Sequence, residues 1–293
     1  MDGLLVVNKP QGITSHDVVA SVRRITGEKS VGHLGTLDPM ATGVLPLVLG
    51  RFTRLAQFYN ESEKQYEGTI RFGFSTDTYD AEGERSGPEQ PVELTLEQIR
   101  AATSQFIGRI QQVPPPFSAK KVAGVPAYKL ARKGKEVELK PKEVEVKQFD
   151  ILSWDGQLAG FKATVSAGTY LRSLAHDLGQ ALGPGAHLAS LTRTAVREFK
   201  LEQSHTLEEM QKAVATDGLD EFLLHPRMIL PEFPAVVVPA ESLGRLKNGG
   251  AVNLPEFTKA PTVRVFAGQR ELLAIARRVA GTLFQPKIVL CGN

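Results

Sequence analysis

The order of apolar and polar residues along the chain predicts a mixture of strands and helices. A compact β-type run at 3–9 and alternating runs further on are expected to form strands: 66–72, 143–151 and 161–165. Apolar residues at helical spacing predict helices over three stretches: 15–26, 96–107 and 170–182. A glycine directly after each of these stretches is expected to end the helix.

The pattern changes near residue 230. Prolines punctuate a stretch with little helical periodicity between 226 and 239, which predicts a boundary between a domain at 1–230 and a domain at 235–293. Beyond it, short β-type runs alternate around glycines. This part of the chain is expected to form a small β-barrel-like domain with basic residues that include Arg270, Arg277, Arg278 and Lys287.

Composition and charge exclude some classes of protein. The chain has 293 residues, 42% of them hydrophobic and 23% charged, which is ordinary for a soluble globular protein. The net charge of +3 is too small to identify a nucleic-acid binder. One cysteine, Cys291, excludes an internal disulfide framework and a multi-cysteine zinc site. Without a signal or membrane-spanning segment, the chain is expected to be cytoplasmic.

A glycine-punctuated loop at 31–50 carries one acidic residue, Asp38. The ring of Pro39 disfavours helical geometry for Asp38, so the carboxylate is expected on a stiff turn. The glycines allow the backbone to bend sharply or to approach a ligand closely. Such a carboxylate is a candidate nucleophile or base. An Asp-Pro pair is commonly only a turn, and the loop has neither a phosphate-binding glycine motif nor metal-ligand spacing.

Four further residues are candidates on chemical grounds. Tyr66 falls on the apolar face of an alternating strand, where it either packs or stacks on a flat ligand. Arg172 is in the first turn of a helix and opposes its dipole, so it is either a surface arginine or a functional residue whose charge an anion answers, and the conflict favours the second. Asp80 lies in an acidic stretch expected to be a solvated connection, where it could orient a cation. Lys9 could meet phosphate or be solvated.

The segment at about 114–140 has a different character. Consecutive prolines end regular structure, and no acidic residue occurs from 118 to 135. Phe117 and Tyr128 are interleaved there with basic residues: Lys120, Lys121, Lys129, Arg132, Lys133 and Lys135. A basic loop with aromatic side chains can follow a phosphate backbone and stack on unpaired bases. We expect RNA contact here, the alternative being a solvated charged surface.

Motifs along the chain resemble the bacterial TruB family, the tRNA pseudouridine-55 synthases. They occur in order within about the first 230 residues: NKPQGITS at 8–15, GHLGTLDPMATGVL at 32–45, Tyr66 shortly before IRFG, PPPFSAKK at 114–121, SAGTYLRSLAHDLG at 166–179 and GAHLASLTRTAV at 185–196. The C-terminal segment is similar, more weakly, to the PUA RNA-binding domain of that family.

The resemblance implies an α+β pseudouridine synthase fold, with a mixed, mainly antiparallel central sheet flanked by helices and loops, and a PUA-like β-barrel domain at 235–293. It also implies isomerisation of uridine 55 in the TΨC arm of tRNA, in which the base is flipped out, the N1–C1′ bond is broken and C5 is joined to C1′. No cofactor or metal is expected, because the reaction involves neither redox change nor group transfer. The expected partner is tRNA alone, bound by a monomer without an obligatory protein partner or membrane.

The resemblance also implies roles for single residues. Asp38 matches the catalytic aspartate of the family, Tyr66 the tyrosine that stacks on the base, and Arg172 the arginine that pairs with the aspartate. His33 matches a histidine associated with displacing the target nucleotide, and Leu191 an apolar residue of the site. Together with the candidates above, the expected substrate-binding residues are His33, Asp80, Leu191, Lys9, Lys120 and Lys121.

Two alternatives remain open. A non-catalytic protein that binds or folds tRNA would need only the basic loop and the C-terminal domain, whereas Asp38, Tyr66 and Arg172 would be superfluous. A guide-RNA-dependent pseudouridine synthase would be expected to carry long basic extensions for partner proteins, which this sequence lacks.

Overall fold

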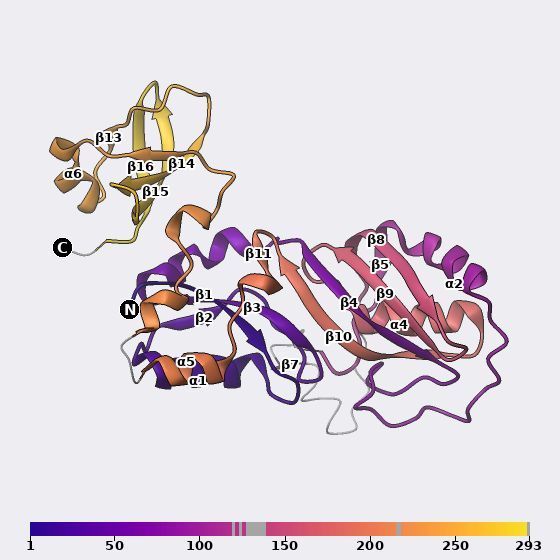
Figure 1. The fold of residues 1–293 in the computed structure, drawn as a ribbon. Coiled ribbons are helices and arrows are strands. Elements are labelled where there is room, and N and C mark those ends of the chain that lie inside the picture. Colours follow the sequence, from indigo (N-terminus) through magenta and orange to yellow (C-terminus); the bar gives the residue numbers. More distant parts are fainter. Residues whose placement is uncertain (119–120, 123–124, 127–138, 215–217, 292–293) are drawn as a thin grey trace.

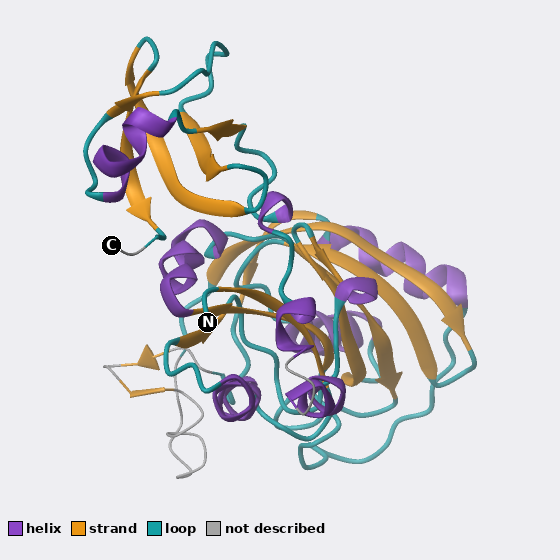
Figure 2. Ribbon diagram, turned by 60° about the vertical axis from the view of Figure 1, so that its left-hand side comes forward, coloured by secondary structure: helices purple, strands orange, loops and turns teal. Residues whose placement is uncertain are grey.

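The computed structural model describes residues 1–118, 121–122, 125–126, 139–214 and 218–291, with side chains left out at 121–122 and 125–126. Its described strands form a nine-stranded sheet, a five-stranded sheet and a two-stranded ribbon. In Figures 1 and 2 the five-stranded sheet stands apart from the larger sheet, which forms the body of the molecule. The mixture of strands and helices expected from the sequence is confirmed.

The nine-stranded sheet is mainly antiparallel, as expected. Its seven-strand path runs in the order β1 (Gly3–Lys9), β3 (Thr42–Leu49), β10 (Ala186–Val196), β4 (Lys64–Phe72), β9 (Leu158–Val165), β8 (Lys142–Trp154) and β5 (Gly108–Gln112). Two short strands complete it: β2 (Val31–His33) pairs with β3, and β11 (Phe199–Lys200) with β10. The parallel pair among its described ladders is β3 with β10. This pair brings the loop before β3 next to the C-terminal half of the chain.

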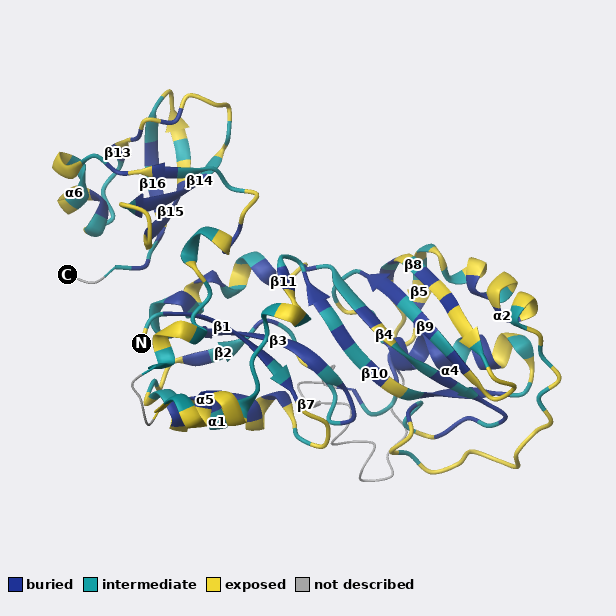
Figure 3. Ribbon diagram, in the orientation of Figure 1, coloured by how far each residue is buried: buried dark blue, intermediate teal, exposed yellow. Residues whose placement is uncertain are grey.

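Helices cover the sheet at both ends (Figure 1). Near β1 and β2 lie α1 (Ser15–Thr26) and α5 (Leu207–Ala213), whereas α2 (Leu96–Thr103) packs on β8 and α4 (Leu171–Leu182) on β10. Figure 3 shows the outward face of α2 exposed, whereas buried and exposed residues alternate along β8 beneath it. Short 3-10 helices connect the elements: η1 (Gly50–Tyr59), η2 (Ser104–Phe106), η3 (Leu201–Gln203), η5 (Gly218–Phe222) and η6 (Pro226–Met228).

Local signals in the sequence define most helix ends. Thr14 and Thr95 close capping boxes with Asp17 and Gln98, and Gly27 ends α1 in the left-handed conformation. The predicted helix at 96–107 is too long, however. Its α-helical part ends at Thr103, a 3-10 turn follows, and Ile107 is extended with its side chain exposed.

The second sheet lies within residues 235–289. Its order is β12 (Ala235–Val237), β14 (Thr262–Ala267), β15 (Glu271–Ala280), β16 (Leu283–Val289) and β13 (Val252–Asn253), with η7 (Ala240–Ser242) and α6 (Leu243–Lys247) beside it. The remaining ribbon pairs β6 (Lys121–Val122) with β7 (Val125–Pro126). The division of the chain at 230–235 into two domains stays a prediction.

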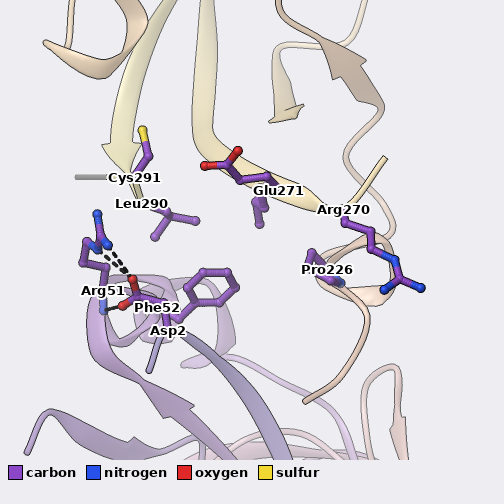
Figure 4. A pocket seen from close by; sticks show the side chains of 9 residues that line it. Asp2, Arg51, Phe52, Pro226, Arg270, Glu271, Leu290 and Cys291 are labelled. Atoms are coloured by element: carbon purple, nitrogen blue, oxygen red, sulfur yellow. Dashed lines mark hydrogen bonds and ion pairs between the residues drawn. The ribbon is translucent and has the colours of Figure 1, made fainter. Parts of the chain in front are cut away.

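Apolar side chains join the second sheet to the first. One buried cluster contains Val6 and Val48 from the large sheet, Phe52 from η1, and Ile275 and Ile288 from the small sheet. Beside this cluster is a cavity of about 380 Å³, in which the Asp2 carboxylate accepts hydrogen bonds from the Arg51 backbone and side chain (Figure 4). None of the helices in the described part of the chain is long and apolar enough to cross a membrane.

Candidate active site

A cavity of about 770 Å³ opens where α1, the loop between β2 and β3, and the first turn of α4 meet. Its lining is unusually rich in titratable groups, contributed by segments far apart in the sequence: His16, His33, Asp38, Asp80, Glu82 and Arg172. Thr14, Ser15, Phe117 and Ser118 complete much of the remaining wall. The size is within the range of pockets that enclose a small organic ligand.

Asp38 is held from both of its chain neighbours. The hydroxyl of Ser15, at the start of α1, accepts a hydrogen bond from Leu37 N at 2.8 Å and donates to Leu37 O at 3.1 Å. On the other side, Pro39 O accepts a hydrogen bond from Gly12 N at 2.9 Å. The Asp38 side chain itself is 38% exposed. A fixed backbone therefore presents a carboxylate to the cavity, as the Asp-Pro step predicts.

Arg172 is the cation that faces this carboxylate. Its Nε lies 2.9 Å from Asp38 Oδ2 and its Nη1 lies 3.4 Å from Asp80 Oδ2. The other contacts are backbone carbonyls: Nη1 donates to Thr78 O at 3.1 Å and Nη2 to Phe117 O at 3.0 Å. Arg172 is the second residue of α4, is buried, and opposes the helix dipole there. The anions expected to answer it are these two carboxylates.

The acidic stretch after β4 was expected to be solvated, and Asp80 is an exception. Most of residues 81–97 are exposed or half-buried, but Asp80 is only 4% exposed. Its Oδ1 accepts hydrogen bonds from Thr78 Oγ1 at 2.6 Å and Glu82 N at 3.1 Å, and Oδ2 faces Arg172. Glu82 follows at the cavity wall, where burial and the charges of Asp80 and Asp38 raise its pKa.

A second buried arginine, missed by sequence reasoning, supports the same loop from the core. Arg193 on β10 is 0% exposed and donates to Val44 O at 2.7 Å, Gly35 O at 2.9 Å and Thr36 O at 3.2 Å. Tyr66 lies opposite it on β4. Burial lowers the pKa of Arg193, and the electrostatic interaction with the Tyr66 side chain partly offsets this effect. The available signal was a cation at an inward position of β10, flanked two residues away by buried Leu191 and Ala195.

Comparisons with known proteins identify the family of this chain. A family model described as "TruB family pseudouridylate synthase (N terminal domain)" matches residues 23–171, about half of the chain. The chain belongs to the TruB family. A second model, "tRNA pseudouridylate synthase B C-terminal domain", matches residues 172–243. The resemblance seen in the sequence motifs is thereby confirmed.

Individual TruB-family relatives match over nearly the whole chain. A protein of Solibacter usitatus named tRNA pseudouridine synthase B is 48% identical, with 99% of this chain and 100% of that protein covered. A protein of Thermobifida fusca with the same name is 42% identical, with 100% and 99% covered. A chain in the crystal structure of a Cbf5-Nop10-Gar1 complex is 25% identical with a TM-score of 0.73, covering 99% of this chain and 85% of that one. The expected pseudouridine synthase fold is confirmed by this likeness.

Lys9 of this TruB-family chain has a different environment from the one expected. The expectation of an exposed cation is wrong, because Lys9 is 0% exposed and its Nζ donates to the carbonyls of Pro10 at 2.8 Å, Ile13 at 2.7 Å and Pro39 at 3.2 Å. Burial lowers the pKa of Lys9 to about 8, an effect partly opposed by Asp38. Lys9 thus links the backbone at residues 10 and 13 to Pro39 and stabilises the turn that carries Asp38.

The remaining candidate residues of the TruB motifs are placed as follows. His33, at the end of β2, lines the cavity, and burial together with Arg193 and His16 lowers its pKa. Tyr66 and Leu191 are buried in the core on neighbouring strands and do not line the cavity. Lys120 and the side chain of Lys121 lie outside the described residues, as does most of the basic loop. Among the described residues, no cluster of His, Cys, Asp and Glu could hold a metal ion.

Proposed function

We propose that this chain isomerises a uridine of tRNA to pseudouridine and that Asp38 is its catalytic carboxylate. One observation carries the proposal: a partly exposed carboxylate on the wall of a nucleoside-sized cavity is ion-paired at 2.9 Å with a buried arginine. The TruB-family relatives named tRNA pseudouridine synthase B support the choice of tRNA. The sequence motifs support uridine 55 of the T arm as the target.

The reaction requires the target base to leave its stack, at a cost of about a few kcal/mol that protein contacts must offset. The N1–C1′ bond then breaks, the uracil turns, and C5 bonds to C1′. A proton leaves C5 and one is taken up at N1, so atoms and electrons balance without a cofactor. Asp38 supplies the carboxylate oxygen for this exchange. Arg172 holds that oxygen in place, and Asp80 holds Arg172.

Three residues are assigned to the target nucleotide, two of them to its base. Tyr66 is the residue that stacks on it, and Leu191 contributes apolar surface on the neighbouring strand. The position of Arg193 supports this placement, because it lies opposite Tyr66 in the sheet and its guanidinium binds the carbonyls of Gly35 and Thr36, close to Asp38 in sequence. His33, which lines the cavity, is assigned to displacing the target nucleotide.

The rest of the tRNA is assigned to two basic regions. The segment at about 114–140, with Lys120 and Lys121, follows the phosphate backbone of the T arm. Residues 235–293 form a PUA-like domain that extends the RNA contact beyond the catalytic domain at 1–230. The chain acts as a monomer in the cytoplasm, without a protein partner. The structurally similar chain, by contrast, was crystallised in a complex named Cbf5-Nop10-Gar1.

The test uses the purified chain alone with a tRNA transcript carrying tritium at C5 of uridine. Tritium release from this transcript, and none from a transcript with cytidine at position 55, is expected. Release at other uridines would contradict the assignment of the site. Release only after a guide RNA or partner protein is added would show a guided enzyme, and tight binding without release would show a binding protein.

A further inference from the structure

Tyr79, in the turn between β4 and α2, has an uncommon backbone conformation. Its φ is +65°, and it is one of three non-glycine residues with positive φ in the described part of the chain, together with Arg197 and Leu230. A bulky side chain rarely adopts this left-handed conformation unless surrounding contacts impose it. The contacts of Tyr79 and its chain neighbours therefore indicate why this conformation is maintained.

Both chain neighbours of Tyr79 bind the same guanidinium. Thr78 O accepts a hydrogen bond from Arg172 Nη1 at 3.1 Å, and Asp80 Oδ2 lies 3.4 Å from the same nitrogen. In an extended chain, the backbone carbonyl of Thr78 would point sideways, in the hydrogen-bonding direction, whereas the Asp80 side chain would point out of the pleat. The left-handed turn at Tyr79 lets a carbonyl and a carboxylate converge on Arg172.

The ring of Tyr79 stacks on His176 of α4. The ring centroids are 3.7 Å apart and the planes differ by 9°. His176 is four residues after Arg172, one turn further along the same helix. His176 Nδ1 is buried without a hydrogen-bond partner in the described structure, and burial lowers the pKa of the ring. Stacking against the Tyr79 ring, rather than a hydrogen bond from Nδ1, therefore positions the His176 ring.

The turn is fixed separately to the sheet. Leu188 N on β10 donates to Tyr79 O at 3.0 Å, and Ala81 N donates to Leu188 O at 3.0 Å. The stack therefore joins α4 to a turn that β10 already holds. It is a contact between turn and helix that does not involve Arg172 itself.

We propose that the stack of Tyr79 on His176 positions Arg172 between Asp38 and Asp80. Neither ring lines the cavity, so the pair acts through Arg172 and touches no substrate. Loss of the stack lets α4 shift relative to the turn, which misplaces the guanidinium and with it the Asp38 carboxylate. This inference rests on the proposed function, in which Arg172 holds the catalytic carboxylate.

The experiment compares four variants of the full chain by single-turnover tritium release and by tRNA binding. Tyr79→Phe keeps the ring, whereas Tyr79→Asn removes it but tolerates the left-handed backbone. His176→Ala removes the partner and His176→Phe restores an aromatic face. We expect a fall of about tenfold in rate for Tyr79→Asn and His176→Ala, with Kd for tRNA within twofold of the wild type. Tyr79→Phe and His176→Phe should stay within about threefold of the wild-type rate.

Rates are expressed per molecule competent to bind tRNA, so a loss of folded protein does not register as a loss of rate. The double variant Tyr79→Asn with His176→Ala should be no slower than the single variants, because the two residues form one contact. Full rates in both single variants, additive losses in the double variant, or an effect confined to Kd would each overturn the inference. Such results with an active wild type leave the proposed function intact, whereas an inactive wild type would refute that function first.

Discussion

The loop around Asp38 is held by cations on two sides, and the two sides differ in what the cations bind. Facing the cavity, Arg172 is paired with the carboxylates of Asp38 and Asp80. Facing the core, Arg193 donates to the carbonyls of Gly35, Thr36 and Val44. Lys9 does the same for Pro39, directly after Asp38.

This difference separates two tasks. A buried cation bound to carbonyl oxygens fixes the path of the backbone. Neither Lys9 nor Arg193 forms a close ion pair with a described residue, and burial lowers the pKa of both. A cation bound to a partly exposed carboxylate fixes a reactive group instead. Variants on the cavity side should therefore lose rate, and variants on the core side should lose stability.

Among the variants that compare the two sides of the loop, Arg172→Ala should have the largest effect. Removing the guanidinium leaves Asp38 without its partner, so the single-turnover rate of tritium release should fall by about 10³-fold. Arg109→Ala is the matched control, because the side chain of Arg109 is 76% exposed and is paired with exposed Glu143 at 3.9 Å. A rate within threefold of the wild type for Arg172→Ala would contradict the claim that the cavity-side cation holds the reactive carboxylate.

Arg193→Met tests the core side. Carbonyls of the loop lose their donor in a buried site, at about 1–3 kcal/mol for each unpaired group, offset in part because a buried charge is also removed. We expect the free energy of unfolding to fall by about 3 kcal/mol in urea titrations. Arg193→Lys keeps the charge but lacks the planar guanidinium group, so its free energy of unfolding should lie between those of the wild type and Arg193→Met. Unchanged stability in both variants would show that the loop does not depend on this guanidinium.

Asp177 on α4 is a carboxylate that, unlike Asp38 and Asp80, forms no ion pair with a described residue. It therefore shows what burial of a carboxylate costs without a cation. Burial raises its pKa from 3.8 to about 6, so the folded chain holds this proton more tightly than the unfolded chain does. Its contribution to the free energy of unfolding therefore falls as pH rises from about 4 to about 6. Asp177→Asn should be more stable than the wild type by about 1 kcal/mol at pH 7.5, after allowing for solvent screening. Below pH 4 the gain should vanish, and an equal gain at every pH would contradict this origin.

The sequence predicted what depends on neighbours in the chain. Capping boxes at Thr14 and Thr95 involve residues three positions apart, and the buried face of β4 follows from alternation, with Tyr66, Ile70 and Phe72 all buried. Asp38 was recognisable because the Asp-Pro step is itself local. The conflict of Arg172 with its helix dipole pointed to an anion without identifying it.

What the sequence could not show depends on contacts across long separations. Arg193 binds a carbonyl 158 residues away, and the alternation along β10 indicates that its side chain points inward but not which group it binds. Asp80 resembles the exposed acidic residues that follow it, and only the fold brings it to Arg172. Lys9 resembles a solvated cation at a strand end, although the backbone around it supplies three acceptors.

The most direct test of the account is Asp38→Asn, which keeps the shape of the side chain and removes its charge. Single-turnover tritium release from 5-tritiated tRNA should fall by at least about 10³-fold, while Kd for tRNA stays within threefold. Asp150→Asn, at an exposed position on β8, should leave both quantities unchanged. Wild-type tritium release by the Asp38→Asn variant would contradict the central claim that this carboxylate carries out the reaction.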